Sequence, residues 1–184
     1  TVTTSSHPAG MLGDLTVARA ARTARASSFD QTGRNRDNWI IMPGEERTLA
    51  EIEGPGFITH IWMTQPKHYR ECLLKFTWDN ARHPSIVCPL GDFFGLGHNI
   101  VNSYQSHLFT ASARTDNEFN SFCALNSYAP MPFRERAVVE LVNESSEPHI
   151  QYFYVDYEAL EDNPDDDLGY FHTEFRRENP FGGW

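Results

Sequence analysis

The chain has 184 residues and carries 15 Lys and Arg against 25 Asp and Glu, a formal net charge of −10. Hydrophobic residues make up 40% and charged residues 22%, a globular composition that argues against disorder and predicts one domain with an added tail. No apolar run approaches the roughly 20 residues that span a bilayer, and an acidic chain has no general attraction for polyphosphate. We therefore expect neither a membrane span nor a nucleic-acid partner.

The first 36 residues form a predicted N-terminal arm that differs in charge from the rest of the chain. They carry five basic and two acidic residues, a net charge of +3, whereas residues 37–184 carry ten and 23, a net charge of −13. Asp14 is a candidate N-cap for a short Ala-rich helix that ends near Ser27. A basic arm suits docking onto an acidic neighbouring subunit, although an Arg-rich, Ser-rich start also resembles a transit peptide. Three arginines are expected on one face of this helix: Arg19, Arg22 and Arg25.

From residue 37 onward the sequence indicates short strands separated by Gly, Pro and Asn. No long helical pattern lies between them, so the strands should pair antiparallel. We predict an all-β fold, an antiparallel β-sandwich of jelly-roll type over residues 37–160, with one long loop at 91–119 and an acidic loop in 161–184. The strands are expected at residues 47–53, 57–64, 72–79, 84–90, 120–125, 136–143 and 149–157.

A dense polar cluster precedes the first of these strands. Asp30, Asn35 and Asp37 are short hydrogen-bonding side chains on one predicted loop, of the kind that contact sugar hydroxyl groups. The same side chains also form Asx turns and end helices, so a purely structural role is equally compatible with the sequence.

A second candidate site is the glycine-rich stretch that follows the strand at 84–90. It places Asp92 and His98 beside the aromatic pair Phe93 and Phe94. Aromatic rings stack on the apolar face of a sugar, and a carboxylate accepts hydrogen bonds from its hydroxyl groups. Alternatively, the two phenylalanines close the end of the sandwich.

Other chemistry-bearing residues give weaker signals. The cysteines are far apart in the sequence, which excludes a zinc ribbon and a disulfide framework, and we interpret them as buried apolar residues. The histidines show no H-x-x-x-H spacing, so no metal site and no cofactor are predicted. Glu51 and Glu53 share a strand face and could form a carboxylate pair, although solvated outer-face residues are the simpler interpretation. The three cysteines are Cys72, Cys88 and Cys123.

Five sequence blocks, taken together and in order, resemble glycoside hydrolase family 172. Arg34 stands where the first block of that family is expected to have a second glycine after Gly33, so that turn departs from the family pattern. The five blocks comprise residues 27–45, 53–64, 91–95, 130–134 and 170–180.

The resemblance implies a pair of jelly rolls, of which this chain matches the first and, within 161–184, the start of the second. It also implies a homo-oligomer (trimer or hexamer) and a carbohydrate substrate with fructofuranose or D-arabinofuranose linkages, cleaved or rearranged with retention. The family's catalytic carboxylates are expected in blocks resembling G-E-G-D-E and G-T-G-T-E-D-Y, and neither string occurs in these 184 residues.

We therefore assign no catalytic residue to this chain and expect it to be one half of a longer enzyme. The alternative is a non-catalytic jelly-roll protein that assembles into a ring or shell or binds carbohydrate. The candidate substrate-binding residues are Asp30, Asn35, Asp37, Asp92, Phe93, Phe94 and His98.

Overall fold

A computed structural model describes residues 20–164 and 167–178, and almost all of its regular structure is β-strand. The only helix in these residues is α1 (Leu90–Phe93). The strands are β1 (Ala21–Ser27), β2 (Trp39–Ile41), β3 (Glu46–Glu53), β4 (Gly56–Thr64), β5 (Cys72–Trp78), β6 (Ile86–Pro89), β7 (Ile100–Val101), β8 (Tyr104–Gln105), β9 (Phe109–Ala113), β10 (Glu118–Phe119), β11 (Cys123–Ser127), β12 (Met131–Phe133), β13 (Arg136–Asn143) and β14 (His149–Leu160).

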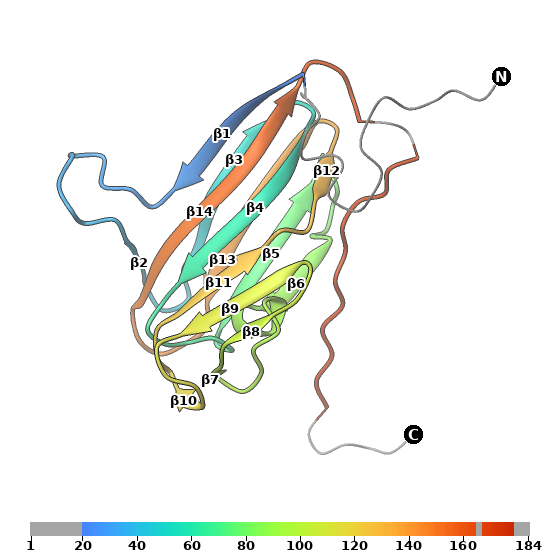
Figure 1. Cartoon of the computed structure of the whole chain (residues 1–184). Helices are drawn as coiled ribbons and strands as arrows, with labels where there is room; N and C mark the ends of the chain where they lie inside the picture. The colour runs from blue at the N-terminus through green and yellow to red at the C-terminus, as the bar shows by residue number, and fades with distance from the viewer. Residues whose placement is uncertain (1–19, 165–166, 179–184) are drawn as a thin grey trace.

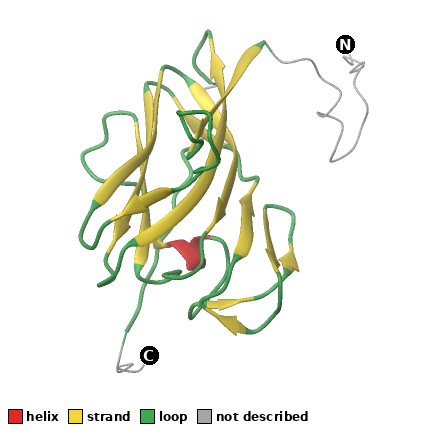
Figure 2. Cartoon of the chain, turned by 90° about the vertical axis from the view of Figure 1, so that its left-hand side faces the viewer, coloured by secondary structure: helices red, strands yellow, loops and turns green. Residues whose placement is uncertain are grey.

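Two antiparallel sheets pack face to face, which confirms the predicted β-sandwich (Figure 1). The larger sheet has the order β1-β14-β4-β11-β9-β8, with β12 also paired to β4 and β2 paired to β14. The smaller sheet has the order β3-β13-β5-β6. Neighbours such as β14 and β4 are far apart in the sequence, so the chain crosses repeatedly between the sheets, as jelly rolls do. In Figure 2 the short helix lies among the lower ends of the strands.

The two-residue period of the strands produces the core between the sheets. In β5, every second side chain from Cys72 to Trp78 is buried, and the intervening ones are less so. Phe76 of the smaller sheet stacks on Phe93 of α1, with ring centroids 5.4 Å apart. Phe153 and Val155 contribute fully buried side chains from the larger sheet. Burial of each such apolar side chain contributes about 1.5–3 kcal/mol to the free energy of folding, and together they hold the two sheets against each other.

The predicted N-terminal helix is wrong over residues 21–27. This segment is β1, and all seven of its residues pair antiparallel with β14, from Ala21 opposite Leu160 to Ser27 opposite Tyr154. Helix propensity is a weak preference that tertiary pairing overrides, and here the exposed edge of β14 supplies the partner. β1 therefore belongs to the larger sheet although it precedes residue 37; the helix start expected at Asp14 lies outside the described residues.

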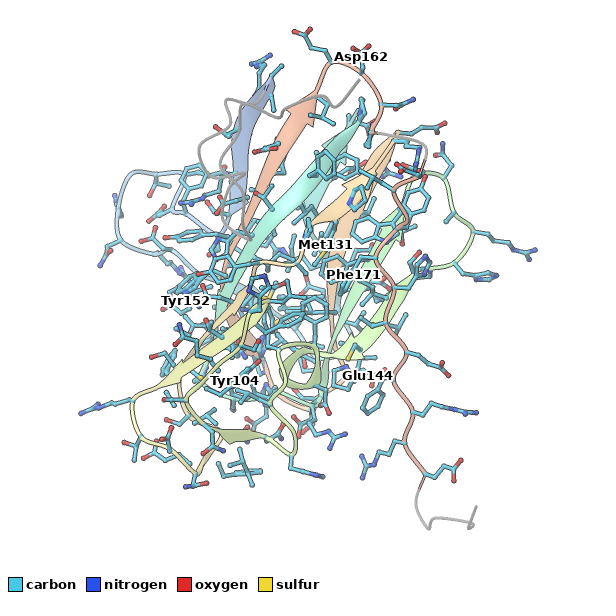
Figure 3. The ribbon with its side chains drawn as sticks, turned by 45° about the vertical axis from the view of Figure 1, so that its right-hand side comes forward. Tyr104, Met131, Glu144, Tyr152, Asp162 and Phe171 are labelled. Atoms are coloured by element: carbon cyan, nitrogen blue, oxygen red, sulfur yellow. The ribbon has the colours of Figure 1, made fainter. Side chains whose placement is uncertain are left out.

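The predicted long loop over residues 91–119 is in fact broken into short elements. It contains most of α1 and the strands β7 to β10, of which all but β9 have only two residues. The described C-terminal residues 167–178 run along the smaller sheet, where the Trp78 indole donates a hydrogen bond to the carbonyl of Phe171 at 2.7 Å (Figure 3). Within the described residues, no helix is long and apolar enough to cross a bilayer.

Gly56 provides a test of how closely the strands pack. A Cβ at this position would collide with the backbone carbonyl of Glu158 and lie 2.8 Å from the ring of Phe133. We expect Gly56→Ala to lower the free energy of unfolding by about 1–3 kcal/mol, measured by urea denaturation. The control Gly97→Ala meets no heavy atom within 4 Å and should change stability by less than about 0.5 kcal/mol. Equal effects of the two substitutions would contradict the packing described.

Candidate functional site

The loop between β1 and β2 is braced by its own acidic side chains. The Asp30 carboxylate accepts hydrogen bonds from the Thr32 amide at 2.9 Å and hydroxyl at 2.7 Å, and from the Arg36 amide at 3.1 Å. The hydrogen bonds from Thr32 lower the pKa of Asp30. Asp37 in turn accepts a hydrogen bond from the Asp30 amide at 2.8 Å. Asp30 therefore forms the turn, while Asn35 lies exposed in the same loop.

A buried serine fastens this loop to the larger sheet. The Ser28 hydroxyl donates to the carbonyl of Asp37 at 2.7 Å and accepts from the amide of Phe153 at 3.0 Å. The backbone of Ser28 also pairs with Phe153, amide to carbonyl, at 3.2 Å. These bonds hold Asp37 over the outward face of β14.

Beside Asp37 lies a hollow of about 300 Å³ whose walls are mainly aromatic, and we call it the aromatic hollow. Trp62 of β4 stacks on Tyr154 of β14, with ring centroids 4.8 Å apart. Phe29 contributes a ring that is 58% exposed to solvent. The hollow faces the β1–β2 loop, the side on which Tyr152 is seen in Figure 3. Its lining residues are Ser28, Phe29, Asp37, Trp62, Tyr152 and Tyr154.

A chain of polar contacts, which we call the polar row, continues from the hollow across five strands of the larger sheet. Arg25 of β1 donates to Asp156 of β14 at 3.0 Å, and His60 of β4 contacts the same carboxylate through Nδ1 at 2.9 Å. The other ring nitrogen of His60 lies 3.0 Å from Asn126 Oδ1 of β11. The Asn126 amide donates to the Thr110 hydroxyl of β9 at 3.1 Å.

Arg25 joins the polar row to the hollow. Its guanidinium group lies over the ring of Tyr154, 4.4 Å from the centroid. Burial tends to raise the pKa of Asp156, but hydrogen bonds from Arg25 and His60 outweigh it, and the pKa is lowered. The result is a fixed ion pair of a carboxylate and a guanidinium group beside the hollow.

The glycine-rich stretch forms a different cluster around Arg70. The Arg70 Nε lies 3.3 Å from Asp92 Oδ2, and its Nη1 lies 3.2 Å from Nδ1 of the exposed His98. Burial raises the pKa of Asp92, and the charge of Arg70 offsets part of that rise. Phe93 and Phe94 are buried in the core, where Phe94 is 0% exposed. Their rings close the end of the sandwich and have no open face for a sugar.

The structure thus divides the predicted site residues between two places. Asp30, Asn35 and Asp37 lie in the loop beside the hollow, whereas residues 92–98 follow β6, on the opposite side of the molecule in Figure 1. Sequence reasoning missed the aromatic wall of the hollow and the polar row. The signal was present in the alternating pattern of residues 149–157, whose outward positions include Tyr152, Tyr154 and Asp156.

The other chemistry candidates have structural explanations. Glu51 and Glu53 are exposed on the outer face of the smaller sheet, where both pair with Arg136. The three cysteines are free and buried, as predicted. Neither group contributes to the hollow or to the polar row.

The fold and this surface define an all-β sandwich with an aromatic, acid-lined hollow on one sheet. The GH172 domain-like family matches residues 31–154, which include β2 to β13 and the outward aromatic residues of β14. The chain therefore belongs to the GH172 family of glycoside hydrolases. A comparison with curated proteins finds no match.

The polar row predicts a dependence of stability on pH. The pKa of Asp156 is lower in the folded than in the unfolded chain. The carboxylate therefore makes its full contribution to the free energy of unfolding at pH values above its pKa in the unfolded chain, about 3.9. That contribution disappears as the pH falls through its pKa in the folded chain. We expect Asp156→Asn to lower the free energy of unfolding by about 1–3 kcal/mol at pH 7. The difference from the wild type should shrink below about pH 4. The control Glu118→Gln replaces an exposed acid on β10 and should have the wild-type free energy of unfolding at every pH.

The burial of Phe94 gives a second stability prediction. Phe94→Ala should lower the free energy of unfolding by about 3–5 kcal/mol, measured by chemical denaturation, because it leaves a cavity in the core. Phe119→Ala removes a ring that is 67% exposed and should cost less than about 0.5 kcal/mol. An unchanged stability of the Phe94 variant would contradict its structural role.

Proposed function

We propose that this chain is the N-terminal half of a retaining glycoside hydrolase or transglycosylase acting on fructofuranose or D-arabinofuranose linkages. In this proposal it supplies the fold, subunit contacts and part of the substrate pocket, and the catalytic glutamate pair lies outside these 184 residues. The family match over residues 31–154 supports the hydrolase relationship. The furanoside and the retaining mechanism rest on the resemblance of the sequence blocks.

The aromatic hollow is the observation that carries the carbohydrate part of the proposal. Ligand sites are typically concave and largely apolar, with a few convergent polar groups that fix the ligand's orientation. The hollow combines the rings of Phe29, Trp62 and Tyr154 with the carboxylate of Asp37. Phe29 and Trp62 offer apolar ring surface to a sugar, whereas the Tyr154 ring is stacked on Trp62 and covered by Arg25 and contributes mainly its edge. A charged acceptor forms strong hydrogen bonds with the sugar's hydroxyl groups.

The remaining predicted site residues have assigned places in the proposal. Asp30 and Asn35 form the rim of the hollow, where Asp30 holds the loop that carries Asp37. Asp92 and His98, with Arg70 between them, form a second polar contact for a longer substrate or for a neighbouring subunit. No cofactor is needed for this chemistry, because glycoside hydrolysis of this kind uses a pair of carboxylates.

A second candidate function is a non-catalytic carbohydrate-binding or assembly module. It is favoured by the absence from these 184 residues of the strings G-E-G-D-E and G-T-G-T-E-D-Y. Under either candidate the charge difference between residues 1–36 and 37–184 suits docking onto a neighbouring subunit, and the trimer or hexamer rests on the resemblance of the sequence blocks.

Assays of the 184-residue chain and of the intact polypeptide, with fructofuranosides and D-arabinofuranosides, separate the two candidates. The enzyme proposal expects turnover with retained anomeric configuration by the intact polypeptide and none by the chain. Binding without turnover in both samples would favour the module.

The role of the hollow is tested by removing its rings. Phe29→Ala and Trp62→Ala should each weaken binding of fructofuranosyl or D-arabinofuranosyl oligosaccharides by about tenfold, measured by calorimetry, because each removes a ring that lines the hollow. Phe119→Ala, at an exposed ring on β10, is the matched control and should bind like the wild type. Wild-type affinity in both folded hollow variants would refute the assignment.

A further inference from the structure

Three side chains of the types that bind transition metals gather at one end of the sandwich. One ligand atom from each of His68, Cys72 and His149 lies within 4.8 Å of the other two. The cluster is buried: His68 is 7% exposed, and Cys72 and His149 are 0% exposed. It is separate from the aromatic hollow, whose lining includes none of these residues.

The fold brings these residues together from three segments. Cys72 is the first residue of β5, and His149 is the first residue of β14. His68 lies in the turn before β5, where its carbonyl accepts from the Cys72 amide at 3.1 Å. Its own amide donates to Asn120 at 3.3 Å, and its backbone is left-handed, with φ of 68°. The turn therefore holds His68 in a conformation that few residues with a side chain adopt.

The hydrogen bonds around His149 define which ring nitrogen is free. The amide nitrogen of Gln151 donates to the carbonyl of Tyr152 at 2.8 Å and to Gln65 Oε1 at 3.2 Å. Its Oε1 therefore faces His149 Nε2, 2.9 Å away, and accepts a hydrogen bond from the Nε2–H group. In this tautomer Nδ1 carries a lone pair, and this buried atom has no hydrogen-bond partner.

A buried acceptor without a partner is costly and requires an explanation. Histidines that bind metals commonly donate their second ring N–H to a neighbouring acceptor, the arrangement that His149 makes with Gln151. The Cys72 thiol has only a weak contact, to Asn143 Oδ1 at 3.8 Å. His149 Nδ1 and Cys72 Sγ can therefore bind a cation without the loss of a strong hydrogen bond.

The charges near the cluster also favour a cation. The negatively charged Glu71 and Glu147 and the positively charged Lys67 all lie close enough to His68 to interact with its ring electrostatically. The negatively charged Glu71 and Glu144 interact electrostatically with the Cys72 sulfur. Glu71 is held by Asn99, whose amide donates to its carboxylate at 2.9 Å and 3.0 Å. Acidic groups thus outnumber basic ones around the three ligand atoms.

We propose that His68, Cys72 and His149 form a binding site for a divalent transition metal ion of the Zn²⁺ type. Two imidazoles and one thiolate suit Zn²⁺, which these donors bind tetrahedrally, and a water molecule would complete the set. On binding, the sulfur–hydrogen bond of Cys72 is replaced by a sulfur–metal bond, and the proton passes to solvent. The metal would tie the turn before β5 to the start of β14.

Titration of the metal-free chain with Co²⁺ alone tests the site, because Co²⁺ bound by a thiolate gives a charge-transfer absorption band. We expect one Co²⁺ per chain, displaced by one Zn²⁺. Zn²⁺ at 100 times its dissociation constant should raise the melting temperature by about 5–10 °C. Cys72→Ser should abolish the band, and His68→Gln should weaken binding by more than about 100-fold.

The matched control is Cys88→Ser, at a buried free cysteine on β6 outside the cluster, and it should keep the band. A wild-type chain that gives no band and no rise in melting temperature would overturn the proposal. A band that persists in the Cys72 variant would also overturn it. The wild-type titration decides the question even where a variant fails to fold.

Discussion

The two-residue period of β14 is the constraint on which the rest of the structure depends. This strand pairs with β1, β2 and β4, and its inward side chains, including Phe153 and Val155, lie in the core. Its outward side chains include Ile150, Tyr152, Tyr154 and Asp156. Because a shift by one residue would exchange the two faces, the burial of the inward set fixes the outward set. The hollow and the polar row are consequences of that register.

The strands with a strong apolar pattern could be predicted from the sequence, and the others could not. Residues 136–143 coincide with β13, because they form a long run rich in Val and Leu, although a register shift interrupts the pairing with β3 between Val139 and Glu140. β1 was missed because an Ala- and Arg-rich segment has no strand pattern of its own and becomes a strand only by pairing with β14. The two-residue strands β7, β8 and β10 are too short to leave any pattern.

The candidate site was predictable only in part, for a related reason. A polar loop is visible in the sequence, so Asp37 could be named, but the aromatic neighbours Trp62, Tyr152 and Tyr154 come from two strands that pair only in the fold. Phe93 and Phe94 have the composition of a sugar site, yet a sequence does not distinguish a ring that faces solvent from one that fills a core. Family membership adds the glycoside hydrolase relationship, and the geometry adds the aromatic hollow beside Asp37.

The central claim is that the outward face of β14 and β4 binds a furanosyl sugar, and indole nuclear magnetic resonance tests it most directly. The Trp62 indole lines the hollow. The Trp78 indole lies on the smaller sheet, donates a hydrogen bond to the carbonyl of Phe171, and serves as an internal reference. On titration with a fructofuranosyl or D-arabinofuranosyl oligosaccharide, the Trp62 signal should move and the Trp78 signal should stay. A stationary Trp62 signal, with shifts confined to the amides of residues 91–98, would contradict the account.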